Sequence, residues 1–122
     1  MNKTIREIID ATDRLRPNAI DDNEKIAWLK GFEQRIYNEI YRTHTDNGEL
    51  AEVSTLTEAS ELSVPSPYDE MYSYYLMAMY DFNHAEYDRY NNDIDMLGAL
   101  YEDFERYYNN THTSAGVKTL TV

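Results

Sequence analysis

The chain has 122 residues and a mass of 14.4 kDa, the size of one domain. It carries 23 acidic residues against 11 basic ones, a net charge of -12, and no cysteine. The lack of cysteine excludes disulfides and thiolate metal sites, and the excess of carboxylates disfavours nonspecific binding to nucleic acid, which depends on Lys and Arg. The longest stretch without Asp, Glu, Lys, Arg or His, residues 71–80, is too short to span a membrane. Because the first ten residues lack the apolar core of a signal peptide, we expect the chain to stay where it is made.

Charge and tyrosine are unevenly distributed along the chain. Residues 1–43 contain eight acids and eight bases, whereas residues 44–122 contain fifteen acids and three bases. The whole net charge therefore belongs to the second segment. Ten of the twelve tyrosines also lie there, between Tyr68 and Tyr108.

Two helices are predicted in the first third of the chain. Thr4 and Glu7 have the spacing of a capping box, and the apolar residues that follow recur at helical spacing until Pro17, which predicts a helix over residues 4–16. A second helix is predicted over residues 21–43, because acids suited to capping precede another apolar face. Gly31 inside this helix indicates close packing or a weak point.

Residues 44–66 have a different composition, with few apolar side chains among Ser, Thr and Glu. The alternation that ends at Pro65 favours a short β-element within residues 50–64. We expect an edge strand, since Pro cannot donate a hydrogen bond to a neighbouring strand. The alternative is a long solvated connection, which in a compact domain is often functional.

Two further helices are predicted over residues 67–82 and 85–110. Ser66 and Pro67 suit a helix start, and the segment that follows is apolar or aromatic nearly all round, which is typical of a central helix. The fourth helix shows a heptad seam, with Gly98 beside it. Its members are Tyr87, Tyr90, Ile94, Leu97, Tyr101, Phe104 and Tyr108. We therefore expect a mainly α, four-helix domain over residues 1–110, with an antiparallel αα-hairpin over 67–110 and an extended tail over 111–122.

No constellation of residues predicts catalysis, a cofactor or a metal ion. His44, His84 and His112 stand singly, without the spacing that places two ligands on one helical face. A calcium loop starting at Asp93 fails because Leu97 and Phe104 would occupy two ligand positions. The many carboxylates lie on faces predicted to be solvated, so we expect a protein that is not an enzyme.

Two surfaces are predicted to be functional. Tyrosines off the main stripe and apolar residues in the connection and the tail are candidates for protein contacts, because Tyr is enriched at binding hot spots. These candidates are Tyr74, Tyr80, Tyr107, Leu50, Val53, Leu56, Val117 and Leu120. The polar side of the fourth helix forms a candidate acidic face that would repel DNA phosphates. Its members are Asp88, Asp93, Asp95, Glu102, Asp103 and Glu105.

Two stretches of the chain carry a resemblance to a known group of proteins. The first comprises RLRPNAIDD (14–22), KIAWL (25–29) and IYNEI (36–40), and the second comprises VPSPYDEMY (64–72), YL (75–76) and EYDRYNND (86–93). Together they resemble small head–tail connector, or head-completion adaptor, proteins of tailed bacteriophages and prophages. The resemblance covers most of residues 4–110 and rests on helix caps, packing positions and turns.

The resemblance implies a structural role in the virion, at the interface between head and tail, with the chain in the host cytoplasm before assembly. Such proteins form a ring beneath the portal protein, extend the channel through which DNA passes, and offer a docking surface to a tail or stopper protein. The implied partners are therefore other copies of the chain, the portal and the tail, with no membrane and no specific binding of DNA. The alternative, which the acidic composition suggests, is a protein-binding module such as a DNA-mimic inhibitor of a nucleic-acid enzyme.

Overall fold

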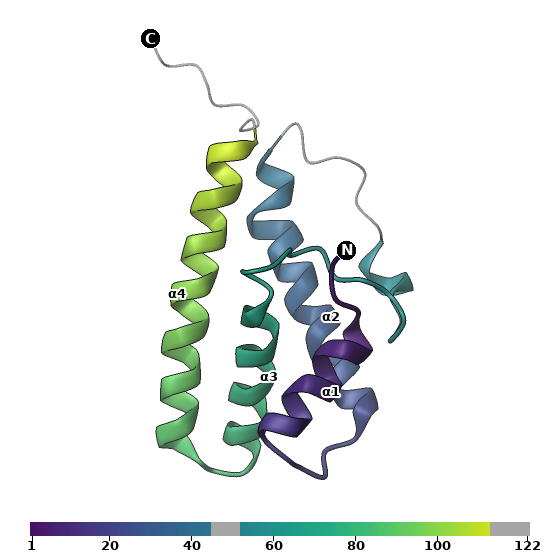
Figure 1. The fold of residues 1–122 in the computed structure, drawn as a ribbon, viewed down its shortest axis with the longest axis vertical. Coiled ribbons are helices and arrows are strands. Elements are labelled where there is room, and N and C mark those ends of the chain that lie inside the picture. The colour runs from purple at the N-terminus through teal and green to yellow at the C-terminus, as the bar shows by residue number, and fades with distance from the viewer. Residues whose placement is uncertain (45–51, 113–122) are drawn as a thin grey trace.

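The computed structural model describes residues 1–44 and 52–112 and is mainly helical, as predicted (Figure 1). Leu50, Val117 and Leu120 lie outside the described residues, as does most of the predicted tail. In chain order the elements are α1 (Ile5–Leu15), α2 (Asp22–Glu39), the 3-10 turns η1 (Tyr41–Thr43) and η2 (Val53–Thr55), α3 (Glu70–Asn83) and α4 (Tyr87–Thr111). The four-helix architecture is confirmed, and the ends of the helices differ from the predicted ones by one to four residues.

Helix α3 is the central element, in contact with all three other helices. It runs antiparallel to α4, while α1 crosses on its other side and α2 lies behind (Figure 1). Tyr72, Leu76 and Tyr80 are fully buried, as expected for a helix that is apolar or aromatic nearly all round. The domain is therefore organised around the α3–α4 hairpin, whose turn places Ala85 in the left-handed region at φ 57°.

The start of α1 follows the sequence signal closely. The Thr4 hydroxyl accepts a hydrogen bond from the Glu7 amide at 3.1 Å, and the Glu7 carboxylate accepts one from the Thr4 amide at 2.9 Å. This reciprocal capping box satisfies two amide donors that the helix leaves free.

Substitution Thr4→Ala should therefore lower the free energy of unfolding by about 1 kcal/mol, the usual value of an N-cap side chain. Chemical denaturation monitored by circular dichroism measures this. Thr4→Ser retains the hydroxyl and serves as the control, with an expected change well below that of alanine. Equal losses in the two variants would show that the cap hydrogen bond contributes nothing.

Helix α3 begins later than predicted. The sequence suggested a start at Pro67 with Ser66 as N-cap, but the Ser66–Pro67 peptide bond is cis and the helix starts at Glu70. Residues 65–69 form a turn in which the Tyr68 amide donates to the Pro65 carbonyl at 3.0 Å. The amide of Met71 donates back to Tyr68 at 3.1 Å, so the turn leads directly into the helix.

The expected β-element is reduced to one isolated antiparallel bridge between Thr4 and Glu61 among the described residues. The Ile5 amide donates to the Ser60 carbonyl and the Leu62 amide to the Lys3 carbonyl, both at 3.0 Å. Residues 58–64 thus lie along the N-terminal segment. Leu62 and Val64 point into the core from there, so this part of the connection is an ordered layer over α1 and α2.

Candidate interaction surface

The predicted contact residues are scattered over the fold. Tyr80 and Val53 are buried in the domain core, at 0% and 6% exposure, so they offer no surface to a partner and the prediction for them is corrected. Tyr74 and Leu56 are half-buried, and Tyr107 is exposed. The structure therefore leaves Tyr107, which is 41% exposed, as the one exposed predicted contact residue among those it describes.

Tyr80 is buried because its hydroxyl has a partner inside the fold. It donates to the Asp13 carboxylate at 2.8 Å, and the Lys25 ammonium lies 2.8 Å from the same carboxylate and 5.3 Å from the Tyr80 ring centroid. Although burial opposes it, hydrogen bonds from Lys25, Tyr80 and Asn18 hold the pKa of Asp13 below its usual value. The position of Tyr80 off the main apolar stripe therefore reflects a polar contact inside the domain.

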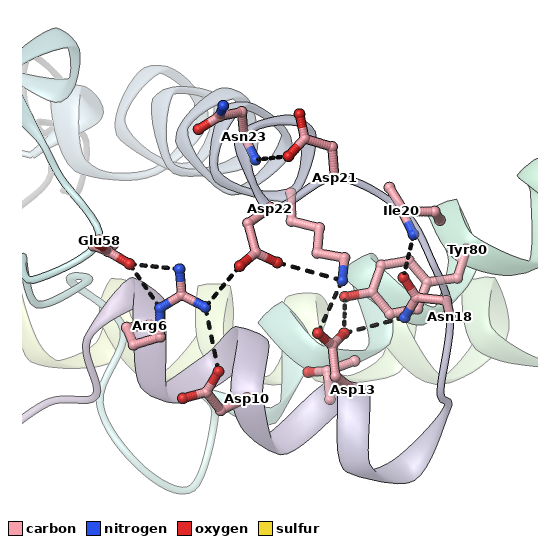
Figure 2. A network of polar contacts seen from close by, with 12 residues as sticks. Arg6, Asp10, Asp13, Asn18, Ile20, Asp21, Asp22, Asn23, Glu58 and Tyr80 are labelled. Atoms are coloured by element: carbon pink, nitrogen blue, oxygen red, sulfur yellow. Dashed lines mark hydrogen bonds and ion pairs between the residues drawn. The ribbon is translucent and has the colours of Figure 1, made fainter.

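A larger network of polar contacts surrounds this group (Figure 2). The guanidinium of Arg6 contacts Glu58, Asp10 and Asp22, and Asp22 in turn lies 3.6 Å from the Lys25 ammonium. These contacts join α1, the start of α2 and the segment around Glu58. Their partial exposure and their pairing within the domain are typical of a structural network.

A second network is buried between α2, α3 and the connection. The Glu33 carboxylate, 1% exposed, accepts hydrogen bonds from the Tyr72 hydroxyl at 2.5 Å and from the Ser63 amide at 2.8 Å. The Val64 amide donates to the Tyr72 hydroxyl at 3.2 Å. Burial raises the pKa of Glu33, against the opposing effect of hydrogen bonds from Tyr72 and Ser63. All of these groups are satisfied by one another, so they fix the connection to the core.

A third network contradicts the predicted acidic face at one position. Asp93 is only 4% exposed, and its carboxylate lies 3.0 Å from Arg16 Nη1, which also contacts the buried carboxylate of Asp81. Burial and the neighbouring carboxyl of Asp81 raise the pKa of Asp93 to about 7, against the attraction of Arg16. Asp93 therefore belongs to an internal ion cluster that joins the end of α1 to both arms of the α3–α4 hairpin.

The remaining members of the acidic face are accessible. Asp88, Asp95, Glu102 and Asp103 are exposed and Glu105 is half-buried. Asp103 pairs with Arg106 at 3.3 Å. No ion pair joins Asp88, Asp95 or Glu102 to another residue of the described chain. Because they recur every seven residues, these three carboxylates form one row along α4.

The heptad seam of α4 is only partly covered. Phe104 and Tyr108 are buried against Tyr41, but Tyr87 and Ile94 are 55% and 39% exposed. Ile94 lines a groove of about 290 Å³ between α2 and α4, together with Phe32, Arg35, Leu97, Gly98, Tyr101 and Glu102. The α2 residues of this groove carried no signal in the sequence, since Phe32 had the spacing of an ordinary core position.

Two of the three histidines lie close together and the third lies apart from them. His44 and His112 flank the ring of Tyr108, with their own ring centroids 6.3 Å apart, while His84 is exposed at the hairpin turn. Within residues 1–44 and 52–112, no three His, Asp or Glu side chains gather as a group that could hold a metal ion. In the same residues, no helix has both the length and the apolar character needed to cross a membrane.

Comparisons of the chain with protein-family models, curated proteins and solved structures found no match.

Proposed function

We propose that the chain is a structural protein of a bacteriophage or prophage head–tail connector, which forms a ring beneath the portal, extends the DNA channel and docks the tail. The proposal begins from the resemblance of residues 14–22 and 64–72 to such proteins. The single observation that carries it further is the exposed row of unpaired carboxylates along α4.

The residues behind the resemblance are those that determine the connections of this fold. Asn18 bonds to the Asp13 carboxylate and to the Arg16 carbonyl, and its own side-chain oxygen accepts from the Ile20 amide. This arrangement turns the chain from α1 into α2. In the second stretch, the amide of Val64, which precedes α3, donates a hydrogen bond to the hydroxyl of Tyr72 within α3. A likeness concentrated at such positions supports common descent of the fold.

The exposed acids of α4 suit a wall past which DNA moves. Asp88, Asp95 and Glu102 are solvent-facing and form no ion pair in the described chain. A surface with such a charge repels phosphates, so DNA passes without being held. In this proposal the subunit works in the virion, at the head–tail interface, after a stay in the host cytoplasm.

The alternative role as a DNA-mimic inhibitor has less support. The three carboxylates of the row repeat every seven residues, or about 10.5 Å along the helix axis. A DNA strand places a phosphate at every 3.4 Å of axis. The row is therefore too sparse to copy the charge pattern of a strand.

The ring is tested by measuring mass with multi-angle light scattering, for the chain alone and mixed with a portal protein from the same genome. We expect a discrete ring-sized species, either alone or when portal is supplied. The matched control is a mixture with an unrelated portal protein, which should leave the mass unchanged. A chain that stays monomeric in every mixture across a wide concentration range would overturn the proposal.

A further inference from the structure

Helices α2 and α4 border a groove that the domain itself does not fill. No Cα atom of α2 lies within 8 Å of one in α4, so the two helices do not pack backbone to backbone. Side chains bridge the gap: the rings of Phe32 and Tyr101 are 6.1 Å apart, and the Tyr101 hydroxyl donates to Glu39 at 2.5 Å. Tyr75 of α3 stacks on Phe32 with 4.6 Å between the ring centroids. The two aromatic residues that line the groove, Phe32 and Tyr101, are therefore held in place by their neighbours.

The α4 side of the groove continues as a row of apolar side chains, of which two are exposed and one is half-buried. Tyr87, Ile94 and Tyr101 are spaced by seven residues and so lie on one side of the helix, over about 21 Å of its length. Between them, a Cβ atom added at Gly98 would meet nothing within 4 Å. The packing of the domain does not require glycine at this position. The open space is suited to a side chain that enters from outside, as a knob enters a hole in a coiled coil.

The charged residues that directly follow the members of this row on α4 are all acidic. Asp88, Asp95 and Glu102 each follow a member of the apolar row by one residue, and all three are exposed. On the α2 side, Arg35 is already paired with Glu39 at 2.9 Å. An entering segment thus meets apolar side chains flanked by three carboxylates that have no cation of their own in the described chain.

We propose that this groove binds a helix of another protein, one whose apolar stripe is flanked by Lys or Arg side chains. An apolar stripe at helical spacing matches the row of α4, which is the helix-in-groove mode of recognition. Basic flanks complement the row of carboxylates and give the binding its specificity. A second copy of α4 fits less well, because it would set its own Asp95 and Glu102 against those already present. This inference does not depend on the ring. A helix bound here would cover the carboxylates that the ring proposal turns toward DNA, so the row serves one role or the other.

The experiment uses the full chain and three labelled peptides of about 21 residues, or three heptads. The first has Leu at the stripe positions and Lys beside them, the second has Glu in place of Lys, and the third has the composition of the first with the stripe scrambled. Fluorescence anisotropy measures the affinities at low and high salt. We expect the first peptide alone to bind, and to bind more weakly as salt increases.

Two substitutions test whether the groove is the site. Ile94→Asp places a charge in it, and Gly98→Leu fills it while improving helix propensity by about 1 kcal/mol, so this second variant should remain folded. Each should weaken binding of the first peptide at least about tenfold, as expected at a hot spot. Leu15→Asp is the matched control, because Leu15 is 71% exposed on α1, and it should leave the affinity unchanged.

Three results would overturn the proposal. One is equal affinity for the Lys and Glu peptides, and another is binding that neither groove variant changes. The third is a dimer in sedimentation velocity that both groove variants dissociate, which would make a second copy the occupant of the groove.

Discussion

Replacement of Arg16 by alanine should lower the free energy of unfolding by about 3–5 kcal/mol near neutral pH, the usual cost of removing one partner from a buried ion cluster. Arg16 contacts both Asp81 and Asp93, whose side chains are 3% and 6% exposed. Without the guanidinium, two carboxylates would face each other in a site that water hardly reaches. Urea denaturation measures the loss. Arg14→Ala is the control, because Arg14 is exposed and forms no ion pair in the described chain, so its expected cost is below about 0.5 kcal/mol.

The same cluster should make stability depend on pH in a direction opposite to that of an aspartate whose pKa is lowered by an ion pair. Asp93 has a pKa of about 7 in the folded chain against 3.8 in the unfolded one, so the folded state holds its proton more tightly. The stabilisation from this proton is complete below about pH 4 and is lost as pH rises through 7. The cost of Arg16→Ala should therefore be larger at about pH 8 than at pH 5, because Arg16 favours the ionised form of Asp93.

Asp93→Asn separates this contribution from those of other groups. The variant cannot ionise at position 93, so the difference in stability between it and the wild type should change across the interval from about pH 4 to pH 8. A constant difference would mean that Asp93 has an ordinary pKa in the folded chain. Equal losses for Arg16→Ala and Arg14→Ala would show that the ion cluster is not a source of stability.

The second large effect is expected at Tyr72. Tyr72→Phe keeps the ring but removes the hydroxyl that donates to Glu33 and accepts from the Val64 amide. A buried amide and a buried carboxylate each lose a partner, which should cost about 1–3 kcal/mol. The loss is measured by thermal and urea denaturation. Because the Tyr72 hydrogen bond lowers the pKa of Glu33, that pKa should rise further in the variant.

Tyr75→Phe provides a matched comparison on the same helix. Tyr75 is half-buried and stacks on Phe32, and no hydrogen bond of its hydroxyl occurs in the described chain. Its loss of stability should stay within about 0.5 kcal/mol. If the two variants were equally stable, the buried network around Glu33 would have no net stabilising effect.

The elements of this fold could be predicted because each has a local signal. The capping box at Thr4 and the stop at Pro17 bracket α1 within one residue at each end. The heptad seam of α4 was predicted less well. A straight helix drifts by about 20° per heptad from a strict seven-residue repeat. The buried side of α4, which contains Phe104 and Tyr108, therefore contains Asp93 in place of Ile94. Helix α3 has 14 residues and α4 has 25, but the excess lies at the C-terminal end of α4. Tyr87 lies beside the hairpin turn, where its ring is 6.0 Å from that of Phe82 and remains 55% exposed.

The buried charges could not be predicted, because their partners are distant in sequence. Lys25, Glu33 and Asp93 occupy positions that look solvated when charge alone is considered. What buries them is a side chain from another element: Asp13 for Lys25, Tyr72 for Glu33 and Arg16 for Asp93. Only their three-dimensional pairing distinguishes these residues from the acids of the exposed row. The groove beside α4 could not be predicted either, because it too is formed by residues that are distant in sequence.

The N-terminal segment has a consequence for the order of folding. Asn2 donates to the Leu62 carbonyl across 60 residues of chain, and the neighbouring backbone bonds to residues 60 and 62 close loops of similar length. The α3–α4 hairpin, in contrast, closes through a turn of a few residues. Since long loops cost more entropy to close than short ones, the hairpin should form early and the N-terminal segment should dock last. Substitutions at Asn2 should then speed unfolding while refolding keeps its rate.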